Sequence, residues 1–298
     1  MKKSSLNQVA AVRRWQTGSA RAFTLTELLV VIGMTAMLGA VLLSASFTTQ
    51  ERVLRAQCVS NLRQIGVGLS LYAAEANDYY PICGLPNGQF PWQTYEIARV
   101  DPADGITITR GYESLGLLFR TKTVPDPKTF YCPSLACASS LFAYDYYTTA
   151  PNGWPSTPVG SGDDNIRAGY NYYPQLRVTE RVITPVGSLM LPKLIFSSQV
   201  QLEFGSPLNL VTPAKWTGLD PKKSVTTDLV TSMSYLSHKA SGSVAGVNAL
   251  FPDGRVVFQN ARTDSQSGSP WDPNLWYAMT ETGNELASFR AIVNGWRP

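Results

Sequence analysis

The stretch RAFTLTELLVVIGMTAMLGAVLLSASF, residues 21–47, is the most distinctive part of this 298-residue chain. It is almost wholly apolar from Phe23 onward, and Glu27 is its one charged side chain after that point. Residues 25–47, as a helix rising about 1.5 Å per residue, would cover the roughly 30 Å of a bilayer's hydrocarbon core. The pattern therefore predicts a membrane-spanning helix over residues 23–47.

The charge of the chain is concentrated before this helix. Five basic residues and no acid precede Phe23: Lys2, Lys3, Arg13, Arg14 and Arg21. Removing them from the formal charge of +4 leaves −1 for residues 23–298. A basic flank before an apolar helix indicates that this end stays in the cytoplasm. Because the remainder is not basic, no nucleic-acid partner is expected.

Glu27 is the unusual feature of the apolar run. An ionised group inside a membrane costs roughly 2.5–3.5 kcal/mol, so a lone carboxylate calls for a partner. No Lys, Arg or His lies between Phe23 and Glu51. We therefore expect the partner to come from another chain or from processing. Cleavage after Ala22 would create an amine on Phe23, about one helical turn from Glu27.

Residues 22–38, AFTLTELLVVIGMTAML, together with the basic leader, resemble the class III signal of type IV prepilins and type II secretion pseudopilins. The resemblance implies that a prepilin peptidase cuts between Ala22 and Phe23 and methylates the Phe23 amine. It also implies that Glu27 neutralises a neighbouring subunit's amine during filament assembly. The family usually has Gly before the cut, where this chain has Ala22, the next smallest residue.

This resemblance predicts an α+β, pilin-like fold with a long N-terminal helix packed on a β-rich globular domain. Residues 1–22 would be the leader, 23–47 the transmembrane helix, 48–78 its amphipathic periplasmic half and 79–298 the globular periplasmic domain. The predicted localisation is single-pass in the inner membrane, with extraction into a filament. The implied partners are the inner membrane, the prepilin peptidase, other pilin or pseudopilin subunits and the assembly platform. The alternative is a membrane-tethered periplasmic binding protein that does not polymerise.

The segment after residue 47 is polar but keeps a helical period. Apolar positions recur at steps of three and four residues: Leu54, Cys58, Leu62, Ile65, Leu69 and Tyr72. This spacing places them on one buried stripe, with Arg52, Arg55 and Arg63 facing outward. The turn formers Asn77 and Asp78, shortly before Pro81, predict the end of the helix.

The rest of the chain has the punctuation of a β-rich domain. All 20 prolines lie from Pro81 onward, which disfavours long helices there. Strands are expected over residues 105–109, 177–184, 188–196, 244–251 and 255–259. The last two flank Pro252, Asp253 and Gly254, a hairpin turn signal.

A second resemblance covers most of the chain in islands. RAQCVSNLRQIGVGLSLYAAEANDYYP (residues 55–81), FYCPS (130–134), GYNYY (169–173) and NALFPDGRVVF (248–258) are similar to large pseudopilin-like proteins of planctomycetes. Those proteins carry a C-terminal signature of His, about nine residues, then Asp-Gly. Here 14 residues separate His238 from Asp253 and Gly254. The resemblance bears on architecture rather than on biochemistry.

Four cysteines could form disulfides on the predicted periplasmic side: Cys58, Cys83, Cys132 and Cys137. Three pairings are possible, and the sequence does not choose among them. Free thiols and a zinc site are the alternatives. Against zinc, Cys132 and Cys137 have four residues between them and no second matching pair follows.

Two acidic stretches raise the possibility of calcium, which takes six to eight oxygen ligands. They contain Asp101 and Asp104, and Asp163, Asp164 and Asn165. Neither has enough ligands alone or the spacing of an EF-hand, so a solvated turn is the default interpretation. No other cofactor is expected.

No catalytic group is expected. His238 is the only histidine, and nothing in the sequence groups a nucleophile and a base with it. We interpret His238 as a surface or capped histidine beside a loop. Asp253 and Gly254 are interpreted as turn residues.

Overall fold

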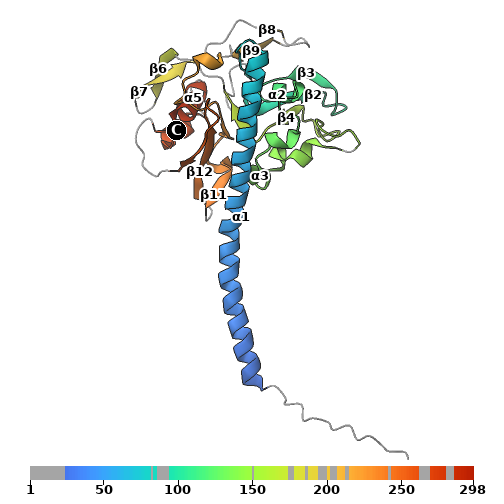
Figure 1. Ribbon diagram of the computed structural model, residues 1–298, viewed down its shortest axis with the longest axis vertical. Helices are drawn as coiled ribbons and strands as arrows, with labels where there is room; N and C mark the ends of the chain where they lie inside the picture. The colour runs from blue at the N-terminus through green and yellow to red at the C-terminus, as the bar shows by residue number, and fades with distance from the viewer. Residues whose placement is uncertain are drawn as a thin grey trace, which may run out of the picture. The chain divides into compact units, whose positions relative to one another are not determined.

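The computed structural model describes the backbone of residues 24–81, 83–85, 94–149, 151–173, 178–184, 187–193, 200–201, 207–211, 215–240, 243–261, 269–279 and 285–298. The chain divides into two compact units, residues 1–47 and 48–298. Within the second unit, the sheets and short helices lie around the C-terminal half of helix α1 (Figure 1).

Helix α1, Leu25–Glu75, is the longest element of the fold. Its end agrees with the prediction, because Asn77 and Asp78 adopt left-handed φ angles of 54° and 72°. The Asp78 amide then donates to the Ala73 carbonyl at 2.9 Å, which closes the last turn.

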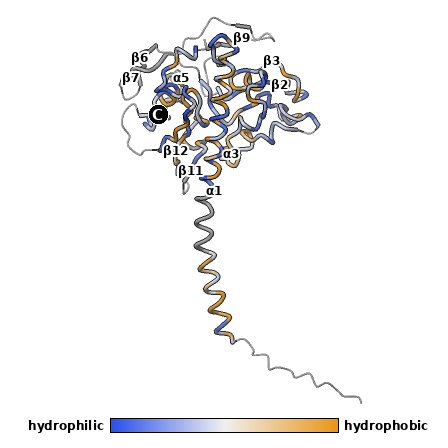
Figure 2. Tube along the Cα trace, in the orientation of Figure 1, coloured by the Kyte–Doolittle hydropathy of each residue, from blue (hydrophilic) through white to orange (hydrophobic). Residues whose placement is uncertain are grey.

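The predicted membrane crossing is wrong. Among the described residues, no helix is long and apolar enough to span a bilayer. Thr24, Thr26, Glu27 and Thr35 are polar side chains at the start of α1, whereas a crossing takes about 20 consecutive, mainly apolar residues. Figure 2 shows the apolar colour on the first turns of α1 and again on parts of the second compact unit. This finding corrects the predicted transmembrane half of the pilin-like fold and the single-pass inner-membrane localisation; the observed class is α+β.

The strands form antiparallel sheets. The largest sheet has the order β11-β12-β10-β5, with β13 also paired to β12. Its strands are β5 (Tyr170–Tyr172), β10 (Thr226–Asp228), β11 (His238–Ala240), β12 (Ser243–Leu250) and β13 (Val256–Asn260). A second sheet has the order β3-β2-β4, built from β2 (Glu96–Val100), β3 (Ile108–Tyr112) and β4 (Asn165–Arg167).

Smaller elements complete the described fold. The remaining strands are β1 (Cys83–Leu85), β8 (Val200–Gln201) and β9 (Pro207–Val211), which form one sheet, and the hairpin of β6 (Val178–Thr184) and β7 (Gly187–Lys193). The short α-helices are α2 (Gly116–Arg120), α3 (Pro133–Ala136), α4 (Pro273–Ala278) and α5 (Glu285–Gly295). The 3-10 turns are η2 (Pro127–Phe130), η3 (Ser140–Phe142), η4 (Tyr144–Tyr147), η5 (Trp216–Gly218) and η6 (Met233–Tyr235).

Four of the five predicted strands correspond to β6, β7, β12 and β13. The hairpin turn is confirmed, since Gly254 has a φ of 82° and Asp253 Oδ1 accepts the Arg255 amide. The prediction over residues 105–109 is displaced, because β3 begins only at Ile108. Asp104 accepts hydrogen bonds from the amides of Ile106 and Thr107, which holds those residues in a turn.

The buried stripe of α1 forms the centre of one core. Cys58, Leu62, Ile65 and Leu69 are fully buried, with Leu54 and Tyr72 partly buried at its ends. A second core contains side chains of α4, α5 and β12, including Leu275, Trp276, Phe289 and Val247, together with Trp296, which follows α5.

The arginines beside the stripe behave differently from one another. Arg52 and Arg63 are exposed as predicted, but Arg55 is only partly exposed. Its guanidinium lies 4.3 Å from the centre of the Phe258 ring, so a cation–π contact holds it against β13.

Candidate functional site: a buried histidine beside a disulfide

His238 is the first residue of β11 and is completely buried. Its Nδ1 lies 2.7 Å from Glu51 Oε1 of α1. Its Nε2 lies 3.1 Å from Asp228 Oδ2 of β10 and 2.8 Å from Asn248 Nδ2 of β12. Because β12 lies between β10 and β11, the sheet order brings Asp228, His238 and Asn248 together. The interpretation of His238 as a surface histidine is therefore wrong.

Opposing effects act on the imidazole. Burial alone would lower the pKa of His238, since it disfavours the charged ring. The negative charge of Asp228, with hydrogen bonds from the ring to Asp228 and Glu51, outweighs burial and raises the pKa. The ring is thus stabilised as an imidazolium between two carboxylates.

Asp228 is buried as completely as His238. Its Oδ2 accepts the backbone amide of Asn248 at 2.6 Å. Its other oxygen, Oδ1, is buried and has no hydrogen-bond partner among the described atoms. An unsatisfied buried acceptor costs about 1–3 kcal/mol, so this oxygen is an unusual feature of the site.

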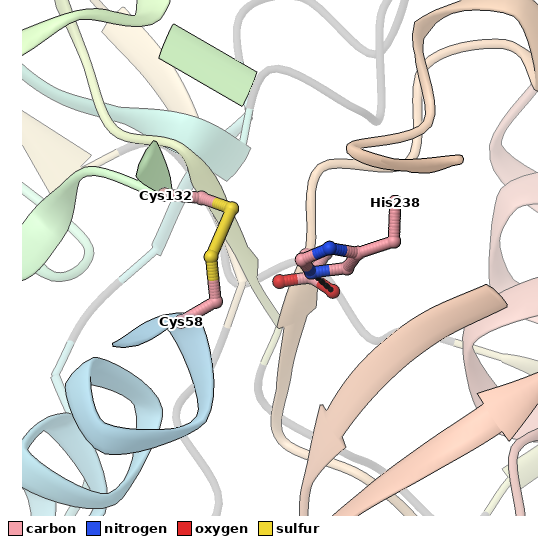
Figure 3. A group of neighbouring side chains, drawn as sticks. Cys58, Cys132 and His238 are labelled. Carbon is pink, nitrogen blue, oxygen red and sulfur yellow. Dashed lines mark ion pairs between the residues drawn. A yellow bond between two sulfur atoms is a disulfide. The ribbon is translucent and has the colours of Figure 1, made fainter. Parts of the chain in front are cut away.

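A disulfide lies directly beside this ion-pair cluster. Cys58 of α1 and Cys132, which precedes α3, are both fully buried and bonded to each other, with their Cα atoms 5.2 Å apart. Figure 3 shows the imidazole of His238 next to this bridge. One potential ligand atom from each of Cys58, Cys132, Asp228 and His238 lies within 4.8 Å of all the others.

Local contacts fix the position of the bridge. Asn61, one turn after Cys58, donates from Nδ2 to the Tyr131 carbonyl at 3.0 Å, which holds the Cys132 segment against α1. Gly169 lies against the same segment, and a Cβ there would be 2.5 Å from the Cys132 nitrogen. Ser134 of α3 contacts Glu51 Oε2 at 3.4 Å, so it braces the carboxylate that faces His238.

The other two cysteines do not join this cluster. Cys137 is free and exposed. Cys83 belongs to β1, and its side chain lies outside the described part of the structure. The structure thus selects Cys58 and Cys132 among the pairings that the sequence left open.

Glu27 has a partner within its own chain. The Thr24 amide and hydroxyl donate to Glu27 Oε2 at 2.9 and 2.7 Å, and Thr24 Oγ1 accepts the Glu27 amide at 3.2 Å. This is a capping box at the start of α1. These hydrogen bonds come from neutral groups, so a charged partner from another chain or from processing stays a prediction. The predicted cleavage residues, Ala22 and Phe23, lie outside the described residues.

The two aspartates of one proposed calcium site, Asp163 and Asp164, are engaged by arginines. Arg167 binds Asp163 through both carboxylate oxygens, and Arg99 contacts Asp164 at 3.2 Å. Asn165 lies opposite Arg99 in the pairing of β4 with β2, and its backbone amide donates to Asp163 Oδ1. Its side-chain Oδ1 is buried and has no hydrogen-bond partner among the described atoms.

The other acidic stretch is equally occupied. Asp101 and Asp104 accept amides of their own loop. In the described part of the chain, the group of three or more His, Cys, Asp or Glu side chains close enough together to hold a metal ion is the cysteine–histidine cluster.

Asp253 and Gly254 serve the hairpin, where Asp253 also pairs with Arg255 at 3.0 Å.

Sequence reasoning missed Glu51, Asp228 and Asn248. Asn248 left a signal, since it is a polar residue in the apolar strand VAGVNALF, residues 244–251. Such a residue, when buried, needs hydrogen-bond partners.

Comparison of the chain with known protein families, characterised proteins and solved structures found no match.

Proposed function

We propose that this chain is a structural subunit of a pilin-like or pseudopilin-like filament, of a type II secretion or pilus-like system, and that it assembles through the start of α1. The observation that carries the proposal is an apolar helix surface exposed around its whole circumference. Nine side chains there are between 50% and 77% exposed: Leu25, Leu28, Leu29, Val30, Val31, Ile32, Met34, Met37 and Leu38. Exposed apolar surface of this extent is typical of an interaction site.

The energetics favour covering this surface. Fully burying an aliphatic side chain stabilises by about 1.5–3 kcal/mol, so covering nine half-exposed ones is worth roughly 10 kcal/mol per subunit before the entropy of association. Identical helices can supply this cover to one another through ridges and grooves. Gly33 and Gly39, with no atom within 4 Å of an added Cβ, leave room for a close approach.

The contact between copies would be head-to-tail, because a helix with one polar end offers different surfaces to its two neighbours. Such contacts produce open filaments rather than closed rings. Glu27 is exposed, so a neighbouring subunit's amine has access to its carboxylate.

Processing fits the same proposal. A prepilin peptidase would cut between Ala22 and Phe23 and methylate the new amine of Phe23. This cut retains Thr24, so the mature chain would keep the capping box that starts α1. No catalytic activity is part of the proposal.

The experiment is co-expression of the full chain with a prepilin peptidase, followed by N-terminal sequencing and by electron microscopy of sheared fractions. The expected product begins at methylated Phe23 and forms filaments. The decisive variant is Glu27→Gln, because Gln also completes a capping box but carries no charge. It should be processed and helical yet fail to assemble. Normal assembly of Glu27→Gln would mean that Glu27 serves only as the helix cap.

A further inference from the structure

We propose that Cys58, Cys132, Asp228 and His238 form a zinc site when the disulfide is reduced. The site would therefore have two states, an oxidised one closed by the disulfide and a reduced one closed by Zn²⁺. This inference rests on the second compact unit alone and does not depend on filament assembly.

The positions of the four side chains suit a tetrahedral ion. Zinc binds thiolate sulfur at about 2.3 Å and imidazole nitrogen or carboxylate oxygen at about 2.0–2.2 Å, so its ligand atoms lie roughly 3.3–3.8 Å apart. The four potential ligand atoms already lie within 4.8 Å of one another, and all four residues are buried. Once the bond between Cys58 and Cys132 is broken, side-chain rotation can separate the sulfurs without moving the backbone.

Asp228 gives an independent indication of a ligand. Its Oδ1 is buried and lacks a donor among the described atoms. A positive ion between the sulfurs and the imidazole would satisfy this oxygen. The ion would also offset the charge of the carboxylate once His238 becomes neutral.

The orientation of His238 is the one that a zinc-bound imidazole requires. Nδ1 is held by Glu51 at 2.7 Å, while Nε2 lies 3.1 Å from Asp228 Oδ2 and 2.8 Å from the side-chain nitrogen of Asn248. The Asn248 side chain would turn away when the ion binds. An imidazole that binds zinc commonly donates its other N–H to a carboxylate, which fixes the tautomer and orients the ring. Glu51 would thus act as a positioning residue, and Nε2 would bind the ion.

The chemistry balances with a phosphine reductant and water. The Cys58–Cys132 bond takes up two electrons from the phosphine, which becomes a phosphine oxide with the oxygen of one water molecule. The two protons of that water go to the sulfurs. Zn²⁺ then displaces both thiol protons, and the Nε2 proton of the imidazolium, into solvent. Two thiolates and an imidazole favour zinc over calcium or magnesium, which prefer oxygen ligands.

The first test uses the reduced full chain under argon, titrated with Co²⁺ as a spectroscopic probe and with Zn²⁺ in competition. The expected result is one tetrahedral, thiolate-bound Co²⁺ per chain, displaced by one Zn²⁺. The oxidised chain should show no such spectrum. Asp228→Asn and His238→Gln should weaken binding at least tenfold, and Glu51→Gln about tenfold. Cys137→Ser, at an exposed cysteine outside the cluster, should bind as the wild type does.

The second test needs no variant, so it decides the matter even if a variant fails to fold. Zinc should slow alkylation of Cys58 and Cys132 in the reduced wild-type chain at least tenfold, as mapped by mass spectrometry. It should leave alkylation of Cys137 unchanged. The proposal is overturned if reduced wild-type protein binds no stoichiometric Zn²⁺, or if the protected cysteines are others than Cys58 and Cys132.

Discussion

Replacing Cys58 and Cys132 together by alanine should destabilise the oxidised chain by roughly 4 kcal/mol. The bridge joins residues separated by 74 positions. With the loop-closure expression for the unfolded chain, a loop of this length gives about 4 kcal/mol of lost entropy at 25 °C. Both side chains are fully buried, so the small cavities left by the two sulfurs add to the loss rather than offset it.

The assay is urea unfolding followed by tryptophan fluorescence, in the presence of a chelator so that no metal contributes. Cys137→Ala is the matched control and should change the free energy of unfolding by less than about 0.5 kcal/mol, because this residue is exposed. A loss below about 1 kcal/mol in the double variant would refute the reasoning. It would show that the bridge does not constrain the unfolded chain as its loop length requires.

Three further predictions concern other parts of the fold. For the oxidised chain in chelator, the raised pKa of His238 is a source of stability that is fully present below the unfolded value of about 6.5 and is lost as the pH rises through the folded value. The urea concentration at the unfolding midpoint should therefore decrease as the pH is raised above about 6.5, and His238→Gln should remove most of this decrease. Gly68→Ala should lower the free energy of unfolding by about 1–3 kcal/mol, since an added Cβ would lie 2.3 Å from Val124. Gly218→Ala is the control. An added Cβ there has no atom within 4 Å, so the free energy of unfolding should change by less than about 0.5 kcal/mol in the same assay. Thr24→Ala should cost about 1 kcal/mol of helix stability and speed amide exchange in the first turn of α1, because it removes the cap.

Local patterns in the sequence predicted what local physics determines. The stripe from Leu54 to Tyr72 has a helical period, and it is this face of α1 that is buried. The hairpin around Gly254 follows from a turn that needs a positive φ, which glycine adopts without strain. The capping box of Thr24 and Glu27 also has a local sequence pattern, T-x-x-E, although the sequence prediction considered only a charged partner for Glu27.

The buried cluster could not be predicted in the same way. Glu51 and His238 are 187 positions apart, and only the folded sheet and helix bring them together. The choice of Cys132 as the partner of Cys58 likewise depends on packing between α1 and α3. The predicted membrane crossing was wrong. The prediction treated residues 23–47 as one apolar segment, although its described part carries several threonines and Glu27.

The most direct measurement of the central claim is site-specific photo-cross-linking in cells that also express a prepilin peptidase. A photoreactive residue replaces Met37, which is 76% exposed on α1, or, as the control, Val159, which is 70% exposed in the second compact unit. If copies of α1 cover one another, the Met37 position should give a ladder of multimers of this chain, and the Val159 position should give much less. A processed chain that stays monomeric, or that cross-links through Met37 only to other proteins, would contradict the filament account.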